Sequence, residues 1–326
     1  MKTDTLRTAL EDGGLEAIAR GADRVVANVA SVILGKEDVI RAAVVALLAG
    51  GHVIIEDYPG VGKTLLAKAL ARSVSCRFTR IQFTPDLLPS DVTGVSVFDQ
   101  KTGSFRFRPG PIFANIVLAD EINRSSPKTQ ASLLECMEER QATIDNVTHS
   151  IAAPFMVIAT QNPIEYEGTY PLPEAQLDRF MMRLRLGYPD AAAEAAVLQE
   201  QTSGDPLAGL QAVLGAGEVL AMQRAMDGVA VEQSLLGYVV RVLTATRESR
   251  DVYLGASPRA GIALVRASKA LAVLRDRDFV VPQDLKDLGV AVLSHRIILA
   301  PEARAHGKTE ETVITGLLDA VPVPGP

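Results

Sequence analysis

The sequence contains few of the residues that build metal sites and disulfides. Among its 326 residues are two cysteines, Cys76 and Cys136, and four histidines. None of these residues is grouped with the spacing of metal ligands. We therefore expect no structural zinc. A protein with reduced thiols, as in the cytoplasm, is the simplest account of two cysteines so far apart.

Long apolar runs and an excess of basic charge are also missing. The longest apolar stretch, residues 42–51, is shorter than the roughly 20 residues that cross a membrane. Residues 1–14 mix acids and bases and lack the apolar centre of a secretion signal. The formal net charge of −6 gives no overall basic field that would attract nucleic acid. We expect a cytoplasmic protein with no membrane span, and nucleic acid is not the favoured partner.

A glycine-rich segment, residues 57–64, is the most informative feature that is present. It reads D-Y-P-G-V-G-K-T between an apolar run at 52–55 and a helical pattern that begins at Leu65. The backbone N–H groups of such a turn point into one concavity, and the helix dipole adds positive charge. Lys63 can reach the β- and γ-phosphates of a nucleotide, and the Thr64 hydroxyl can bind Mg²⁺. The pattern departs from G-x-x-x-x-G-K-[ST] at its first position, where Asp57 replaces glycine.

A second short apolar run, residues 116–119, ends in an acidic pair. Ligands of open α/β sheets bind at the carboxyl ends of the strands, which is where Asp120 and Glu121 would lie. Asp120 is placed to hold Mg²⁺, and Glu121 to orient and deprotonate an attacking water. A strand that merely runs into an acidic loop is the alternative, and the Lys63-Thr64 motif upstream makes it the weaker one.

Two further polar residues fit the same kind of site. Asn162 follows the apolar run 155–160 and could hold the water or the γ-phosphate, although an asparagine before proline is more often a turn former. Arg259 lies in the first turn of a helix that Ser257-Pro258 begins, where the helix dipole disfavours a cation. A bound phosphate would relieve that cost. The alternative is an arginine paired with a nearby acid.

The order of the elements predicts an α/β fold with two parts. Strand and helix patterns alternate up to residue 189, which indicates a parallel sheet between helices. From residue 190 the pattern is helical. We expect a nucleotide-binding core over 1–189, a helical lid over 190–312 and a tail over 313–326. Hairpins are predicted within 94–108 and 142–149.

Taken in order, these motifs resemble those of AAA+ ATPases, and specifically of the MoxR family. The resemblance covers most of the chain and is carried by five segments: 56–64, 120–124 (D-E-I-N-R), 159–163 (A-T-Q-N-P), 172–180 (L-P-E-A-Q-L-D-R-F) and 255–260 (G-A-S-P-R-A). It implies an AAA+ P-loop NTPase core with a C-terminal all-helical lid.

The resemblance also assigns roles to single residues. Asn162 becomes the sensor-1 residue, Arg259 the sensor-2 residue, and Arg179 the arginine finger, which acts on a neighbouring subunit. A local ion pair with Asp178 is the plain alternative for Arg179. The predicted ATP-binding residues are Asp57, Pro59, Gly60, Val61, Gly62, Lys63, Thr64 and Leu65. Thr64 and Asp120 are predicted to hold Mg²⁺.

By the same resemblance, the chain is a Mg²⁺-dependent ATPase that forms a ring, a hexamer, and remodels a client protein or matures a metalloenzyme complex. Its partner would carry a von Willebrand factor type A domain. In ring-shaped relatives both hairpins face the central pore, where they contact a substrate or partner. For the first hairpin, a packing element with solvated arginines is an equal alternative.

Three rival functions stay open. A nucleic-acid motor or loader is motivated by Lys101, Arg106 and Arg108 on the first hairpin. A metal-chelatase ATPase subunit would have the same core. A nucleotide-gated switch that barely hydrolyses ATP is disfavoured by the intact Glu121.

Overall fold

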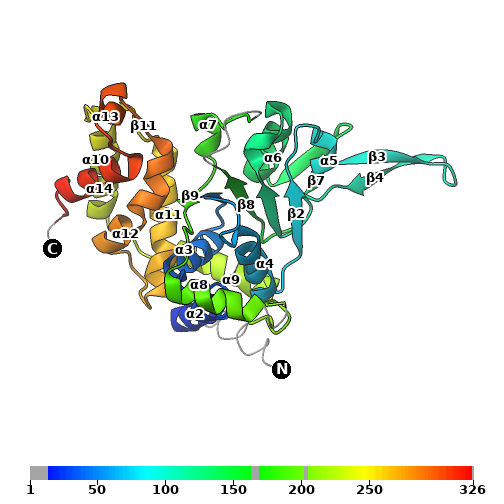
Figure 1. Cartoon of the computed structure of the whole chain (residues 1–326), viewed down its shortest axis with the longest axis horizontal. Coiled ribbons are helices and arrows are strands. Elements are labelled where there is room, and N and C mark those ends of the chain that lie inside the picture. Colours follow the sequence, from blue (N-terminus) through cyan, green and yellow to red (C-terminus); the bar gives the residue numbers. More distant parts are fainter. Residues whose placement is uncertain (1–13, 163–168, 202–204, 325–326) are drawn as a thin grey trace.

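A five-stranded parallel sheet forms the centre of the computed structural model, which describes residues 14–162, 169–201 and 205–324 (Figure 1). The strand order is β2-β5-β8-β1-β9, and every neighbouring pair is parallel. The strands are β1 (Val53–Glu56), β2 (Phe78–Gln82), β5 (Ile116–Asp120), β8 (Met156–Gln161) and β9 (Met182–Leu184). Residues 1–13, on which most of the expectation about a secretion signal rests, lie outside the described part.

Helices cover both faces of this sheet, as the alternating pattern predicts. In β5, Ile116 and Leu118 pack in the hydrophobic cluster of the first three helices, whereas Val117 and Ala119 pack in the cluster that contains α6. The first three helices are α2 (Leu15–Ala30), α3 (Glu37–Leu48) and α4 (Lys63–Ser73), and α6 is Pro127–Glu139. Both faces of the strands are therefore buried, which explains their nearly continuous apolar sequences.

Both predicted hairpins are confirmed, and they touch each other. The first pairs β3 (Gly94–Asp99) with β4 (Ser104–Pro109), and the second pairs β6 (Gln141–Ile144) with β7 (Val147–Ser150). The ring of Phe107 stacks on that of His149, with 3.8 Å between the ring centroids. Figure 1 shows the tip of the first hairpin extending well away from the body. The short helix α5 (Pro89–Thr93) and the 3₁₀ turn η1 (Ile122–Arg124) complete this half.

The C-terminal half is mostly helical. Ser257 begins α11 as expected, because its hydroxyl accepts a hydrogen bond from the Ala260 N–H. One short antiparallel pair, β10 (Val252–Leu254) with β11 (Ile298–Leu299), interrupts the helices. The helices are α7 (Glu174–Leu177), α8 (Ala191–Gln201), α9 (Ala216–Ala225), α10 (Gln233–Glu248), α11 (Pro258–Leu274), α12 (Pro282–Leu293), α13 (Pro301–Ala305) and α14 (Glu310–Ala320), with 3₁₀ turns η2 (Met226–Gly228) and η3 (Ser294–Arg296). No helix in the described ranges is long and apolar enough to cross a membrane.

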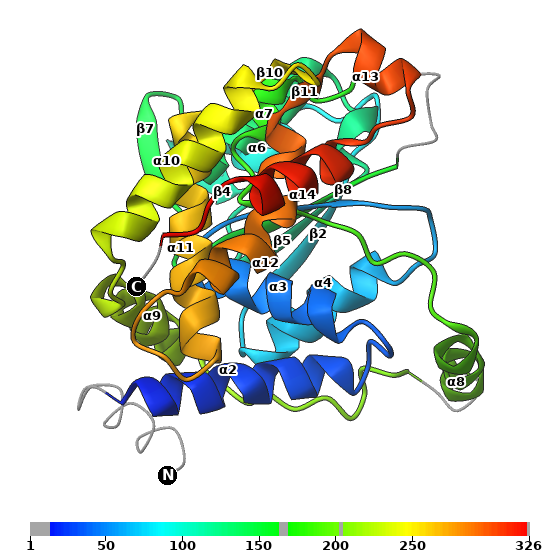
Figure 2. The same cartoon turned by 90° about the vertical axis from the view of Figure 1, so that its left-hand side faces the viewer.

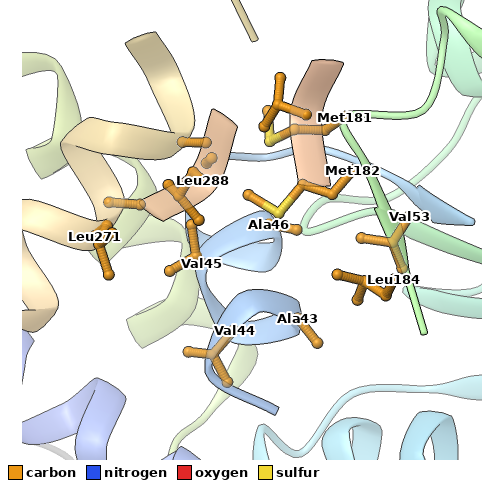
Figure 3. Close-up of a cluster of buried hydrophobic side chains, with 14 of the residues drawn as sticks. Ala43, Val44, Val45, Ala46, Val53, Met181, Met182, Leu184, Leu271 and Leu288 are labelled. Atoms are coloured by element: carbon orange, nitrogen blue, oxygen red, sulfur yellow. The ribbon is translucent and has the colours of Figure 1, made fainter. Parts of the chain in front are cut away.

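The two halves share one hydrophobic cluster. Figure 3 shows Leu271 of α11 and Leu288 of α12 on the same side of α3 as Val45. In Figure 2, α10, α11, α12 and α14 lie together on the side of the molecule that faces the viewer. Helix α14 crosses the boundary expected at residue 312, with Val313, Ile314 and Leu318 buried. Residues 313–320 therefore pack with the helices and are not a tail. The other domain boundaries stay predictions.

A buried arginine fixes the helical half to the segment that precedes β9. The Arg296 side chain is 2% exposed, and its Nε lies 2.6 Å from Asp178 Oδ1. Its other nitrogens donate to the carbonyl oxygens of Asp178, Phe180 and Met181 at 2.7–3.1 Å. One guanidinium thus binds three backbone acceptors of the same segment, of which the Phe180 oxygen also contacts His295 Nε2 at 3.0 Å.

We predict that Arg296→Ala lowers the free energy of unfolding by about 3–5 kcal/mol, because it removes the cation that balances the Asp178 carboxylate and a donor to three backbone carbonyl groups. Urea denaturation followed by circular dichroism measures this loss. Arg304→Ala is the control: Arg304 is 59% exposed and pairs with Glu310, so its removal should cost no more than about 1 kcal/mol. Equal losses in the two variants would show that Arg296 is not an anchor.

Candidate active site

The glycine-rich segment wraps around the amino terminus of α4. Gly60 and Gly62 have φ angles of 84° and 93°, a region that other residues enter only with strain. A Cβ atom added to either glycine would point into open space, so the requirement for glycine is one of backbone conformation. The loop therefore presents its N–H groups at the end of an 11-residue helix, where an anion is stabilised.

Lys63 lies at the first position of α4, beside this loop. Its Nζ donates to the carbonyl oxygen of Asp57 at 2.6 Å, which closes the loop on itself. Burial lowers the pKa of Lys63, whereas the nearby charges of Asp57, Asp120 and Glu121 act to raise it. The ammonium group is thus held between the loop and the acidic pair.

The Asp57 side chain faces away from the cradle. Its Oδ1 accepts from the Tyr58 N–H at 2.8 Å and its Oδ2 from the Gly187 N–H at 2.6 Å. The rings of Tyr58 and Tyr188 stack with centroids 5.4 Å apart. Asp57 therefore ties the loop to the chain that leads into the helical half, which is a positioning role.

Asp120 ends the buried strand β5 with both carboxylate oxygens bound. Oδ1 accepts from the Thr160 hydroxyl at 2.6 Å, and Oδ2 lies 2.7 Å from Arg80 NH2. Thr160 also accepts the N–H of Glu121 at 2.8 Å. A single hydroxyl on β8 thus fixes the carboxylate of one acidic residue and the backbone of the next.

Glu121 follows in a left-handed backbone conformation, with φ 56° and ψ 50°. This conformation is rare for residues other than glycine and often marks functional sites. Its Oε2 accepts from Gln82 Nε2 at 2.7 Å and lies 3.0 Å from Arg124 NH1. Two neighbouring elements therefore hold the carboxylate in one orientation.

These residues meet in one cavity of about 540 Å³. Its lining brings together five residues predicted for one site: Lys63, Thr64, Asp120, Glu121 and Asn162. The remainder of the lining is Pro59, Gly60, Gly62, Leu65, Lys68, Asp205, Pro206 and Leu207. The hydroxyl of Thr64 and the carboxylate of Asp120 are hard oxygen ligands of the kind that Mg²⁺ prefers, so these residues fit that ion.

Arg179 and Arg259 lie elsewhere, in a separate cavity of about 230 Å³ that Arg140 and Arg266 also line. Both contact Glu138 of α6: Arg179 NH2 is 3.2 Å from its Oε2 and Arg259 NH2 is 2.5 Å from its Oε1. The ion pair considered between Arg179 and Asp178 is wrong, because the Asp178 carboxylate binds Arg296. Arg259 does pair with an acid.

Sequence reasoning did not identify Thr160, Arg80 or Gln82. A hydroxyl inside the apolar run 155–160 was a usable signal for Thr160. Arg80 and Gln82 alternate along β2, so they share one face of that strand. Nothing in the sequence marked Asp205, Pro206 and Leu207 as residues of this cavity.

We predict that Thr160→Val, a change of nearly equal volume, lowers kcat about 10–100-fold, the range typical for partners that orient metal ligands. Affinity for ATP should change little, because Thr160 contacts the acidic pair and not the phosphate cradle. Phosphate release and fluorescent-nucleotide titration separate the two quantities. Thr160→Ser, which keeps the hydroxyl, is the matched control, and an equal loss in both variants would contradict the role of that hydroxyl.

Comparison with known proteins agrees with this geometry. Residues 52–182 match the ATPase family associated with various cellular activities (AAA), and residues 244–317 match the AAA lid domain. A crystal structure from Cytophaga hutchinsonii ATCC 33406, of a protein assigned as an ATPase, superposes with a TM-score of 0.90 at 39% identity. It covers 98% of this chain and 99% of its own.

Full-length relatives agree as well. The chain is 41% identical to Chaperone MoxR1 of Mycobacterium tuberculosis over 95% of its own length and 84% of that protein. It is 50% identical to the uncharacterized protein YeaC of Bacillus subtilis, over 92% and 94% of the two chains. It is 31% identical to Protein MoxR of Paracoccus denitrificans, over 90% and 93%. With its phosphate cradle, acidic pair and lid in family order, the chain belongs to the MoxR family of AAA+ ATPases.

Proposed function

We propose that this ATPase works as a Mg²⁺-dependent ring, a hexamer, that remodels a client protein or matures a metalloenzyme complex in the cytoplasm. The observation that carries the catalytic part is the convergence of Lys63, Thr64, Asp120, Glu121 and Asn162 on one cavity. The similarity to a chaperone supports the remodelling part. A protein with a von Willebrand factor type A domain is the proposed partner.

The proposal gives each of these residues a distinct role. Lys63 and the backbone of Gly60 and Gly62 bind the phosphates. Thr64 and Asp120 hold Mg²⁺, which would neutralise charge on the phosphate oxygens.

The remaining two residues act on the reaction itself. Glu121, kept in place by Gln82 and Arg124, orients the attacking water and accepts its proton. Asn162, which is buried at the end of β8, contacts the γ-phosphate.

Arg179 and Arg259 would complete the active site of a neighbouring subunit. Neither lines the cavity that contains Lys63, and both point at one carboxylate, that of Glu138. This carboxylate holds the two guanidinium groups together until a more highly charged γ-phosphate competes for them. A pair of cations presented in this way stabilises charge in the transition state of phosphoryl transfer.

The first hairpin is the proposed contact for the client. Phe98 and Phe105 pack against each other near its tip, where they are 51% and 75% exposed. Exposed aromatic side chains next to Arg106 suit an extended polypeptide. The same combination suits single-stranded nucleic acid, so a nucleic-acid motor is the second candidate. Salt-dependent binding of single-stranded DNA would favour that candidate.

We predict that Lys63→Ala abolishes ATP binding, whereas Glu121→Gln binds ATP normally and loses turnover. Lys63 contacts phosphate in the ground state, but Glu121 acts on the water only during the reaction. Titration with a fluorescent nucleotide, beside measurement of phosphate release, separates the two effects. Equal loss of ATP binding in both variants would contradict the separate roles of Lys63 and Glu121.

We predict that Arg179→Ala binds ATP nearly normally but hydrolyses it poorly, because removal of an arginine finger costs about 10³–10⁵ in rate in well-studied enzymes. Mixing it with Glu121→Gln should restore measurable turnover. Some interfaces of a mixed ring then contain an intact Glu121 on one side and an intact Arg179 on the other.

As a control, wild-type subunits are diluted into each variant to show that mixed rings can hydrolyse ATP. If they hydrolyse ATP and the mixture of the two variants does not, Arg179 does not act across the interface.

A further inference from the structure

Helix α8 stands apart from the other helices. Figure 2 shows it at one edge of the subunit. Among its side chains that the structure describes, Ala193, which lies against Gly35, is the one that is buried. An 11-residue helix is marginal in water without packing, so a partner surface would stabilise α8.

The composition of this helix is apolar and acidic. Residues 190–201 read D-A-A-A-E-A-A-V-L-Q-E-Q, with three acids and no lysine or arginine. The exposed side chains include those of Ala191, Ala192, Glu194 and Ala195. Small apolar side chains beside carboxylates suit a groove with an apolar floor and a positive rim.

Such a groove is present on the same molecule. A cavity of about 750 Å³ lies between α9, α10, α11 and the end of α3. Leu236 and Leu243 contribute to its apolar lining, and Val240 and Ile262, also in the lining, are 61% and 62% exposed. Large aliphatic side chains that stay this exposed around a concave surface indicate a binding site.

The rim of the groove is positive. Arg140, Arg224, Arg266 and Lys269 line it, and Asp227 is the acid among the lining residues. Within the described ranges, none of these four cations forms an ion pair with a carboxylate. Repulsion among them favours an acidic occupant.

We propose that α8 of one subunit docks in the groove of its neighbour, an inference that rests on the ring assembly proposed above. The two surfaces are placed for this contact. Asp205 comes four residues after the end of α8, and it lines the nucleotide cavity of the same subunit. The groove shares Gly50, Arg140, Ile262 and Arg266 with the cavity that contains Arg179 and Arg259. A contact that brings Arg179 to a neighbour's nucleotide therefore also brings that neighbour's α8 towards the groove.

This contact is head-to-tail, because the two surfaces differ. Repeated around an axis, such a contact closes into a ring when the rotation allows it. Burial of the α8 alanines against Val240 and Ile262 supplies the apolar part of the contact. Attraction between Glu194 and the cationic rim determines which surface α8 binds and in which orientation.

The test uses full-length protein in a Glu121→Gln background with ATP, so that nucleotide stays bound. The groove variant is Val240→Asp. The α8 variant carries Glu194→Lys and Ala195→Arg, both to residues that favour helices. Val147→Asp is the matched control, because Val147 is a comparably exposed valine (55%) on the second hairpin. Sedimentation velocity measures assembly, and circular dichroism and nucleotide titration verify that each variant folds and binds ATP.

We expect the groove and α8 variants each to associate about tenfold or more weakly, because each places like charges or a buried carboxylate in the contact. The control should assemble like the parent. An equimolar mixture of the two defective variants should form dimers and nothing larger, since one intact α8 meets one intact groove.

Normal assembly of either variant would overturn the inference, as would a mixture that stays monomeric. A parent that binds ATP but does not assemble would overturn it too. A parent that fails to bind ATP would instead refute the proposed function.

Discussion

The parallel register of β1, β5 and β8 is the constraint on which the active site depends. Ala119 of β5 pairs with Ala159 of β8, and Ile55 of β1 pairs with Thr160. The residues that follow these positions therefore leave the sheet at one edge, within hydrogen-bond reach of one another. A slip of one residue in β8 would turn the Thr160 hydroxyl to the opposite face of the sheet, away from Asp120. Catalytic geometry here is a consequence of strand pairing.

The same edge connects the nucleotide cavity to the helical half. Glu56 comes just before the phosphate loop, and its Oε2 lies 3.2 Å from Arg183 and 3.1 Å from Arg185. Both arginines also contact Glu311 of α14, at 2.5 and 3.1 Å. Arg183 and Glu56 are largely buried, so this network is less screened than a surface pair. Any movement of α14 must rearrange charges next to the phosphate loop, which gives lid motion a physical route to the nucleotide.

The fold could be predicted from the sequence because its signals are local. Residues 57–64 contain a loop and a helix start, and the apolar runs at 52–55, 116–119 and 155–160 are strands that continue into polar residues. Of those polar residues, Asp120, Glu121 and Asn162 line the cavity. The Ser257-Pro258 pair placed the start of α11 where the structure has it.

What the sequence did not predict depends on distant contacts. The Thr160 hydroxyl matters because β8 lies beside β5, and Gln82 because β2 lies on the other side. Neither neighbour can be read from a local pattern. The burial of α14 likewise follows from its packing against α10 and α12.

Under the proposed mechanism, the separation of the two charged sites makes one subunit chemically incomplete. The cavity with Lys63 contains the acids proposed to hold a metal ion and activate water. Its cations, Lys63 and Lys68, lie on α4 at the phosphate cradle. The cations that could stabilise a γ-phosphate from the other side are bound to Glu138 in a different cavity. Arg296 fixes the backbone of residues 178–181 and therefore the direction in which Arg179 leaves the chain. With its direction set by a buried anchor, Arg179 could reach phosphate only through the docking of a second subunit, so turnover would be coupled to assembly.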